Sequence, residues 1–199
     1  MSAYSLYRIL MRTRDENKYN AIVKESLRLT HEYGFSGISI SKIAKRADVS
    51  PATIYIYFEN KEDLLVKIYC DIQKKMGVQI LRKITMNLSL EEQFRCLWKS
   101  SINFYLDNPE FINYREQFEQ TGMMKLIDPK EFQVREYITE FIQKGKERGI
   151  FKPLPLTILI SFAFIPLITL VKLHVAKIQL ITASLIEKVI DIAWYALVV

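Results

Sequence analysis

One short segment combines a strong helix start with side chains that can bind a polyanion. Ser50 is a preferred N-cap residue, and Pro51 suits the first position of a helix. Thr53, Tyr55 and Tyr57 follow, and their hydroxyl groups can donate hydrogen bonds to phosphate oxygens or base edges. Backbone N–H groups and the dipole at such a helix start also favour phosphate. We therefore interpret this segment as a nucleic-acid contact.

Two short helices are needed to position that segment. Ser39 can cap a helix over Ile40–Ala47, and a tight turn then leads into a second helix over Pro51–Phe58. Ile54 and Phe58 lie four residues apart, so both can face the preceding helix. Two short helices joined by such a turn form a helix-turn-helix, whose second helix enters the major groove of DNA.

The rest of the chain is also predicted to be helical. Apolar residues recur at helical spacing, and Gly34 suits the end of the first helix. Ser89 before two glutamates and Asp128 before a proline indicate further helix starts, whereas the stretch Gly145–Pro155 is expected to separate two helices. The remaining predicted helices are Tyr19–Tyr33, Lys61–Thr85, Leu90–Leu106, Pro109–Thr121, Asp128–Arg148, Pro155–His174 and Ile181–Val198. The expected fold class is all-α, with about nine helices.

Composition places the chain among ordinary globular proteins. It has 199 residues, half of them hydrophobic and a quarter charged, which excludes long disorder and suggests one or two domains. The formal charge is +6; residues 1–61 hold 10 basic and 6 acidic groups, and the remainder holds 18 and 16. This basic first third favours an anionic partner for that part. Two cysteines without metal-ligand spacing suit a reducing compartment.

Enzyme and metal sites are not expected. The sequence contains no dinucleotide-binding, phosphate-loop, nucleophile-elbow or zinc-protease pattern. Its two histidines, His31 and His174, are too few for a metal cluster. We therefore expect no catalytic residue, no metal and no cofactor.

One apolar run leaves two interpretations open. Residues 154–171 contain no charged side chain, although Pro155 and Pro166 interrupt them. A helix buried in a core or a subunit interface is favoured over a membrane-spanning helix, because no second run of this kind exists. Since no secretory signal is visible, a cytoplasmic location is expected.

The helix-turn-helix and the segments beside it carry a specific series of motifs. These are Gly34-Phe35, Ser39, Ile43-Ala44, Ala47-Asp-Val-Ser50, Ile54-Tyr55-Ile-Tyr-Phe58 and Asn60-Lys61-Glu62-Asp-Leu64-Leu65. Over residues 22–65 the sequence resembles the TetR/AcrR family of bacterial transcriptional regulators. The resemblance implies an all-helical homodimer with a helix-turn-helix DNA-binding domain at 15–62 and a helical effector-binding and dimerisation domain at 63–199. An N-terminal arm at 1–14 precedes them.

The resemblance also implies which residues contact DNA. Lys61 is expected to clamp a phosphate, and Tyr55 and Tyr57 are expected to donate from their hydroxyl groups. The candidate set is Ser39, Ser41, Lys42, Ser50, Pro51, Ala52, Thr53, Tyr55, Tyr57 and Lys61. The arm carries Arg8 and two further arginines, which either follow the phosphates or minor groove or belong to a leader without DNA contact.

Four residues depart from the family pattern. They are Thr30 in place of phenylalanine, Ser41 in place of arginine, Asp48 in place of glycine and Pro51 in place of lysine. Aspartate tolerates a left-handed turn better than most residues, so we expect the fold to survive. Thr30 is expected to thin the core, and the changes at Ser41 and Pro51 remove two charges from the expected contact face.

The last two predicted helices are apolar on more than one face and must therefore be covered. The same pair of helices from a second subunit gives that cover in a four-helix interface, and a dimer also supplies two DNA-reading helices. The expected dimer interface consists of Phe162, Phe164, Ile168, Val171, Ile186, Val189, Ile190, Ala193 and Leu197.

The middle of the chain is rich in aromatic residues and methionine. Such residues line cavities for apolar or cationic molecules, although core packing explains the same spacing. The candidate ligand-binding residues are Trp98, Asn103, Tyr105, Phe111, Tyr114, Phe118 and His174. A lone histidine on an apolar helix is more often a satisfied structural residue than a ligand contact.

Together these features predict a sequence-specific regulator of transcription. The expected mode is repression at a pseudo-palindromic double-stranded DNA operator, relieved by a small-molecule effector of unknown identity. The alternative is a helical membrane-associated or adaptor protein that does not bind DNA.

Overall fold

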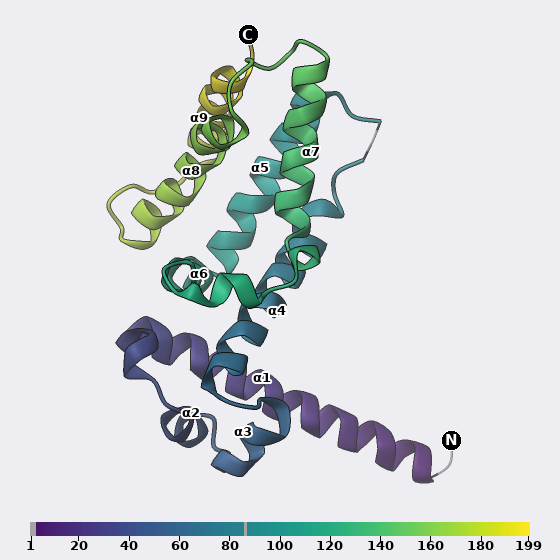
Figure 1. The fold of residues 1–199 in the computed structure, drawn as a ribbon, viewed down its shortest axis with the longest axis vertical. Helices are drawn as coiled ribbons and strands as arrows, with labels where there is room; N and C mark the ends of the chain where they lie inside the picture. The colour runs from purple at the N-terminus through teal and green to yellow at the C-terminus, as the bar shows by residue number, and fades with distance from the viewer. Residues whose placement is uncertain (1–2, 86) are drawn as a thin grey trace. The chain divides into compact units, whose positions relative to one another are not determined.

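The structure is a computed structural model that describes the backbone of residues 3–85 and 87–199 and the side chains of residues 16–85 and 87–199. Within these residues the chain forms nine α-helices and two short 3₁₀ helices (Figure 1). The predicted all-α class is confirmed. The predicted contacts of the arginine-bearing arm lie outside the described side chains.

Every predicted helix has a counterpart in the structure. The α-helices are α1 (Ala3–Gly37), α2 (Ile40–Arg46), α3 (Pro51–Tyr57), α4 (Lys61–Leu81), α5 (Leu90–Asp107), α6 (Glu110–Glu119), α7 (Gln133–Glu147), α8 (Leu156–Val175) and α9 (Ala183–Leu197). The 3₁₀ helices are η1 (Gly122–Leu126) and η2 (Pro129–Glu131). Inside α1, Gly34 has a φ of 67°, so the helical path breaks where glycine indicated its end.

Two helix boundaries differ from the prediction. Helix α4 ends at Leu81, four residues before the predicted end. Asp128 does cap a helix, but the capped element is the single 3₁₀ turn of η2. The backbone of Phe132, with φ −95° and ψ 46°, separates this turn from α7, which therefore begins only at Gln133.

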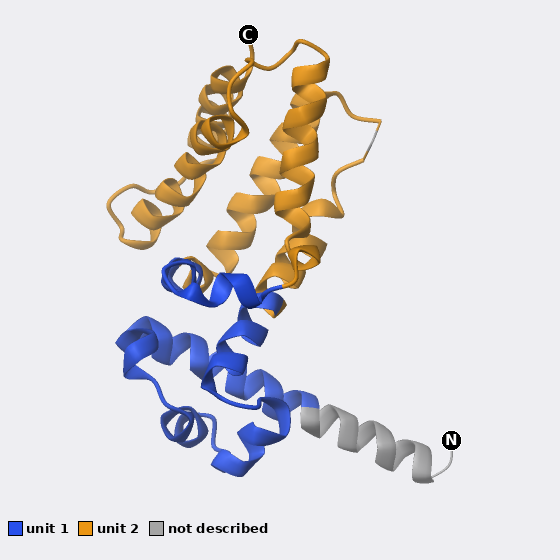
Figure 2. Cartoon of the chain, viewed as in Figure 1, with its two compact units in different colours: residues 1–70, 113–127 blue, residues 71–112, 128–199 orange. Residues whose placement is uncertain are grey.

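The chain divides into two compact units (Figure 2). Unit 1 comprises Met1–Cys70 and Asn113–Ile127, and unit 2 comprises Asp71–Ile112 and Asp128–Val199. Helices α4 and α6 each contribute residues to both units. The functional boundary predicted at residues 62 and 63 stays a prediction, because compactness alone does not assign function.

The core of unit 1 holds the helix-turn-helix against α1 and α4. Ile22 of α1, Ile43 of α2, Ile54 of α3 and Leu64 of α4 are each 0% exposed. At the end of α3 the ring of Phe58 stacks on Tyr19, with a centroid distance of 5.5 Å. The orientation of α3 therefore depends on apolar contacts with two longer helices.

Residues from α6 complete the same core. Tyr114 packs edge-on against Phe35 with ring centroids 5.0 Å apart, and Phe118 stacks on Tyr69 at 4.3 Å. The side-chain amide of Gln117 accepts a hydrogen bond from the backbone N–H of Phe35 and donates one to the Thr30 carbonyl. Unit 1 is thus closed by a helix that lies far along the sequence from the helix-turn-helix.

Unit 2 is a helical core built on aromatic residues. Trp98 is fully buried, and its indole N–H donates to the Ala163 carbonyl at 2.8 Å, which ties α5 to α8. Phe94 lies against Trp194 of α9 with ring centroids 5.4 Å apart. The start of α5 is a capping box between Ser89 and Glu92, as the sequence pattern predicted, and the Ser89 hydroxyl lowers the pKa of the Glu92 carboxyl.

Gly145 has a different role from the predicted one. It does not separate two helices but lies within α7, whose end is set by Gly149 in the left-handed region at φ 66°. The N–H of Ile150 donates to the Gly145 carbonyl, which is the long hydrogen bond of a Schellman motif. A Cβ atom at Gly145 would lie 2.1 Å from the ring of Phe151, so glycine is required for this close approach.

Thr30 leaves an unpaired hydroxyl in the core of unit 1. Its side chain is 1% exposed, and none of the described residues hydrogen-bonds its Oγ1. Thr30→Val keeps the shape and removes this polar group, so we expect stabilisation by about 1 kcal/mol. Thermal unfolding of the full chain should show a midpoint raised by about 2–4 °C.

Thr121→Val provides the matched control for that measurement. The Thr121 hydroxyl donates to the Phe118 carbonyl and accepts from the Met123 N–H, so this substitution should lower the midpoint. A lowered midpoint in Thr30→Val as well would contradict the interpretation of Thr30 as an unsatisfied group.

Candidate nucleic-acid interface

The turn between α2 and α3 is closed by backbone hydrogen bonds. Ser39 caps α2 by accepting a hydrogen bond from the Lys42 N–H. Asp48 adopts the left-handed conformation at φ 53°, and the N–H of Val49 returns to the Ala44 carbonyl at 3.0 Å. This is the helix ending that usually contains glycine. The structure confirms that aspartate is accommodated here.

At the start of α3, the Ser50 side chain caps the helix and so uses one of its free backbone N–H groups. Ser50 Oγ accepts from the Thr53 N–H at 3.1 Å and lies 3.0 Å from Thr53 Oγ1. Pro51 has no N–H to offer. The tip therefore presents fewer backbone donors to phosphate than its helical start predicts, because one is absent and one is used internally.

Four side chains form the exposed face of α3: Pro51, Ala52, Tyr55 and Ile56. The exposed fractions of Tyr55 and Ile56 are 56% and 77%. Ile56 was not among the predicted contacts, because an isoleucine between two aromatic residues resembles core. The burial pattern shows that the inward positions are Ile54 and Phe58 instead.

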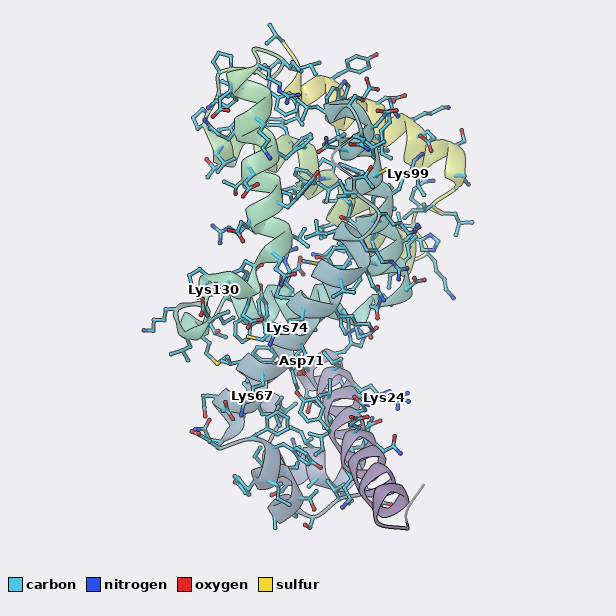
Figure 3. All side chains as sticks on the ribbon, turned by 90° about the vertical axis from the view of Figure 1, so that its right-hand side faces the viewer. Lys24, Lys67, Asp71, Lys74, Lys99 and Lys130 are labelled. Atoms are coloured by element: carbon cyan, nitrogen blue, oxygen red, sulfur yellow. The ribbon has the colours of Figure 1, made fainter. Side chains whose placement is uncertain are left out.

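Tyr57 is only partly available for DNA contact. Its ring packs edge-on against Tyr19 at a centroid distance of 5.6 Å. Its backbone carbonyl accepts a hydrogen bond at 3.1 Å from the Nζ of Lys67, which is labelled in Figure 3. Lys67 Nζ also pairs with Asp63 at 2.8 Å. Lys67 of α4 thus fixes the carboxyl end of α3, a role that the sequence did not indicate.

Two lysines that were predicted to contact phosphate form hydrogen bonds within unit 1. Lys61 Nζ donates to the Phe35 carbonyl and Lys42 Nζ donates to the Gly37 carbonyl, both at 2.7 Å. These bonds satisfy carbonyl groups at the end of α1. A lysine ammonium has three donors, so each residue keeps N–H groups for a phosphate oxygen.

Arg46 belongs to an ion-pair network on the same unit. It forms two hydrogen bonds with the carboxylate of Glu32, at 2.9 and 3.3 Å, and a longer contact with Glu25. The Arg46 hydrogen bonds hold the pKa of Glu32 below its ordinary value. The arginine charge is therefore balanced locally. Ser41 of α2 is exposed.

Two predicted ligand-binding residues, Tyr114 and Phe118, are core residues of unit 1. The Tyr114 hydroxyl donates to the Leu65 carbonyl at 2.8 Å, and burial raises its pKa well above the ordinary value for tyrosine. The phenol is therefore neutral and already paired. Their contacts are those of packing, and their proposed part in ligand binding remains a prediction.

The other predicted ligand-binding residues belong to unit 2 and are not equivalent. Trp98, Tyr105 and Phe111 are buried, and the Tyr105 hydroxyl contacts the Met76 sulfur at 3.5 Å. Asn103 is exposed on α5. His174 Nδ1 accepts a hydrogen bond from the Ile181 N–H at 3.0 Å, which is the structural role weighed for a lone histidine.

The predicted dimer-interface residues divide into two groups. Val171, Ile190, Ala193 and Leu197 are at most 2% exposed within the single chain, so they have no surface left for a partner. Phe162 is 64% exposed, and Phe164, Ile168, Ile186 and Val189 are half-buried. The expected interface was therefore partly placed on the internal side of α8 and α9.

Helix α8 is long and apolar enough to cross a membrane by length and composition, which is the property noted for residues 154–171. Only 28% of its most apolar window is buried within the protomer. A subunit-interface helix passes the same test, so one such helix does not indicate a membrane protein. Within the described residues, no three His, Cys, Asp or Glu side chains gather as a metal site.

Comparison with known families accounts for both parts of the chain. Residues 22–68 match the family described as bacterial regulatory proteins, tetR family, and residues 89–198 match the tetracyclin repressor-like C-terminal domain. The helix-turn-helix and the all-helical second part define a DNA-binding transcriptional regulator. The chain belongs to the TetR family.

Individual relatives agree with this assignment. The chain is 30% identical over 100 residues to an HTH-type transcriptional regulator of Haemophilus influenzae, spanning 50% of this chain and 54% of that protein. It is 42% identical over 65 residues to the fatty acid metabolism regulator protein of Bacillus subtilis, spanning 33% and 32%. The matches thus span about half or less of these curated relatives.

Solved structures share the fold over nearly the whole chain. A TetR family transcription regulator from Marinobacter aquaeolei VT8 aligns with a TM-score of 0.85 and 30% identity, covering 94% of this chain and 98% of that one. The Bacillus subtilis regulator FadR, solved with stearoyl-CoA, aligns with a TM-score of 0.71 and 19% identity, covering 89% and 98%. The latter similarity concerns the fold alone.

Proposed function

We propose that the protein is a cytoplasmic homodimeric repressor, without catalytic activity, that binds a pseudo-palindromic operator and is released by a small-molecule effector. The observation that supports a dimer is that α8 and α9 each have a row of exposed apolar side chains, here called the exposed stripes. Ile158, Phe162 and Ile165 are 42–64% exposed on α8, and Ile192 and Tyr195 are 69–70% exposed on α9.

The spacing of these residues is that of a helix–helix contact. On each helix the exposed apolar residues recur three or four positions apart, which places them on one face. Apolar surface of this extent on a soluble protein marks an interaction site. A two-fold copy of α8 and α9 covers both stripes in a four-helix interface. We therefore revise the interface to these exposed residues, with Phe162 retained from the sequence prediction.

The dimer explains how so short a helix can select a sequence. One α3 reaches only a few base pairs, whereas two copies read two half-sites about 34–36 Å apart. We propose that the contacts come from Ser39, Ser41, Lys42, Ser50, Pro51, Ala52, Thr53, Tyr55, Tyr57 and Lys61. Their support is placement, since these residues lie on the helix-turn-helix or at its edges.

Effector release follows if the ligand favours a dimer whose two α3 helices no longer match this spacing. Such coupling is reciprocal, so bound DNA must weaken effector binding by the same factor. Helix α4 supports this proposal because it begins directly after the helix-turn-helix and continues unbroken into unit 2. The first probe is stearoyl-CoA, which the related Bacillus subtilis structure contains.

Selection of bound sequences from random double-stranded DNA tests the proposed function. We expect a pseudo-palindrome with half-sites one helical turn apart, and an affinity that falls steeply with salt. Tyr55→Phe should weaken binding about 5- to 150-fold, because one hydrogen bond worth about 0.5–1.5 kcal/mol is lost in each of the two half-sites. Tyr33→Phe, on another exposed tyrosine of unit 1, is the control. Failure to enrich any sequence would exclude the operator-binding role.

A further inference from the structure

We propose that Ile56 is a specificity-determining residue that recognises the C5 methyl group of a thymine in each operator half-site. The starting observation is its exposure of 77%, the largest among the exposed large hydrophobic residues described in unit 1. Two residues earlier Ile54 is 0% exposed, and two residues later Phe58 is 1% exposed. Ile56 is therefore an apolar side chain that the fold of unit 1 leaves uncovered.

The position of Ile56 on α3 places it on the DNA-facing side. At about 100° per residue, the exposed residues Pro51, Tyr55, Ala52 and Ile56 occupy an arc of about 140°. The buried Ile54 lies on the opposite side. Ala52 and Ile56 are four residues apart and thus neighbours on the surface. The uncovered side of the helix is a continuous, largely apolar strip.

The length of α3 allows the whole strip to reach base edges. A helix of seven residues is about 10 Å long, which is less than the width of about 12 Å of the major groove. The capped start at Ser50 and the Lys67 bond to the Tyr57 carbonyl hold both ends of the helix. Ile56 is therefore presented by a fixed element rather than by a loose end.

The chemistry of this strip selects thymine. The seven residues of α3 include no charged and no amide side chain, so the usual bidentate contacts to guanine or adenine cannot come from this helix. An isoleucine neither donates nor accepts a hydrogen bond. The apolar group that a base offers in the major groove is the thymine methyl. Ile56 therefore favours T·A pairs where it meets the DNA.

The test replaces thymine by deoxyuridine, which removes only the methyl group. In the operator obtained by selection, each symmetric thymine pair is changed in turn and binding is measured by fluorescence anisotropy. Burial of one methyl group raises affinity about fourfold. Because a symmetric substitution removes one methyl group from each half-site, one position should show an affinity about fifteenfold lower. In Ile56→Ala the ratio between the affinities for the thymine and deoxyuridine operators, here called the thymine preference, should fall to about one.

Ile178→Ala is the matched control, because Ile178 is an isoleucine of similar exposure, 74%, outside unit 1. It should retain the full thymine preference. An unchanged preference in Ile56→Ala, or an operator in which no thymine methyl affects affinity, would overturn the inference. The inference rests on the proposed operator binding, and the two fail differently: no enriched sequence refutes the function, whereas an operator without methyl dependence refutes the role of Ile56.

Discussion

The double substitution Phe162→Asp with Ile192→Asp is expected to convert a dimer into a monomer. Both side chains project from the exposed stripes of α8 and α9, where they are 64% and 69% exposed. A two-fold interface would receive four carboxylates, and each buried unpaired charge costs several kcal/mol. Sedimentation should give a mass near 23.4 kDa for the variant and twice that mass for the parent protein.

The same variant should bind its operator at least about 100-fold more weakly, because two linked reading heads gain that much from binding together. Val78→Asp is the control, since Val78 is 65% exposed on α4 and lies outside both stripes. The control should remain dimeric and bind DNA normally. A dimeric double variant, or a monomeric parent at micromolar concentration, would disprove the α8–α9 interface.

The substitution Gly145→Ala is expected to destabilise unit 2 strongly although it adds only one methyl group. The new Cβ would lie 2.1–2.6 Å from three ring carbons of Phe151, a side chain that is 2% exposed. The ring cannot move outward without leaving Phe141 and Trp194, which it contacts at centroid distances of 5.3 and 5.5 Å. Overpacking of this kind costs about 1–3 kcal/mol, which lowers the unfolding midpoint by about 2–12 °C.

Gly122→Ala separates this effect from the general replacement of glycine. A Cβ at Gly122 meets no atom within 4 Å, so this variant should unfold close to the parent midpoint. Adding Phe151→Leu to Gly145→Ala should recover part of the loss, because the smaller side chain relieves the clash. Equal midpoints for Gly145→Ala and the parent would show that Phe151 can be displaced without loss of packing.

Local patterns predicted most of the secondary structure. Ser50-Pro51 and Ser89-Glu92 mark helix starts whose side-chain caps are present in the structure. Such signals are reliable because both partners lie within one helical turn. Gly145 was misinterpreted because only its local sequence was considered, and a glycine there predicts a helix break. The structure instead requires glycine at this position because the ring of Phe151 packs against it.

Long-range partners explain what the sequence could not show about the candidate site. Lys61 and Lys42 were predicted from their positions to face DNA, and the carbonyls of Phe35 and Gly37 that they also bind belong to a different helix. Nothing in their immediate sequence encodes this pairing. The positioning role of Lys67 was missed for the same reason.

A second feature that the sequence does not determine is which face of an all-apolar helix is buried. When apolar residues occupy every face, as on α8, periodicity cannot tell the inner face from the outer one. Val171 was therefore assigned to the interface although it is 0% exposed, while Ile158 and Ile165 were not assigned. Ile56 was overlooked similarly, because alternating aliphatic and aromatic residues on a short helix leave its orientation undetermined.

The closure of unit 1 by α6 affects the order of events at the ribosome. The chain emerges from its N-terminus, at about 5–20 residues per second, so the helix-turn-helix is complete before Tyr114 and Phe118 are made. The nascent chain exposes the surface of Tyr69 for about 2–10 s before Phe118 is made, and that of Phe35 for about 4–16 s before Tyr114 is made. Unit 1 can therefore finish folding only after ribosomes have translated part of the second half of the chain.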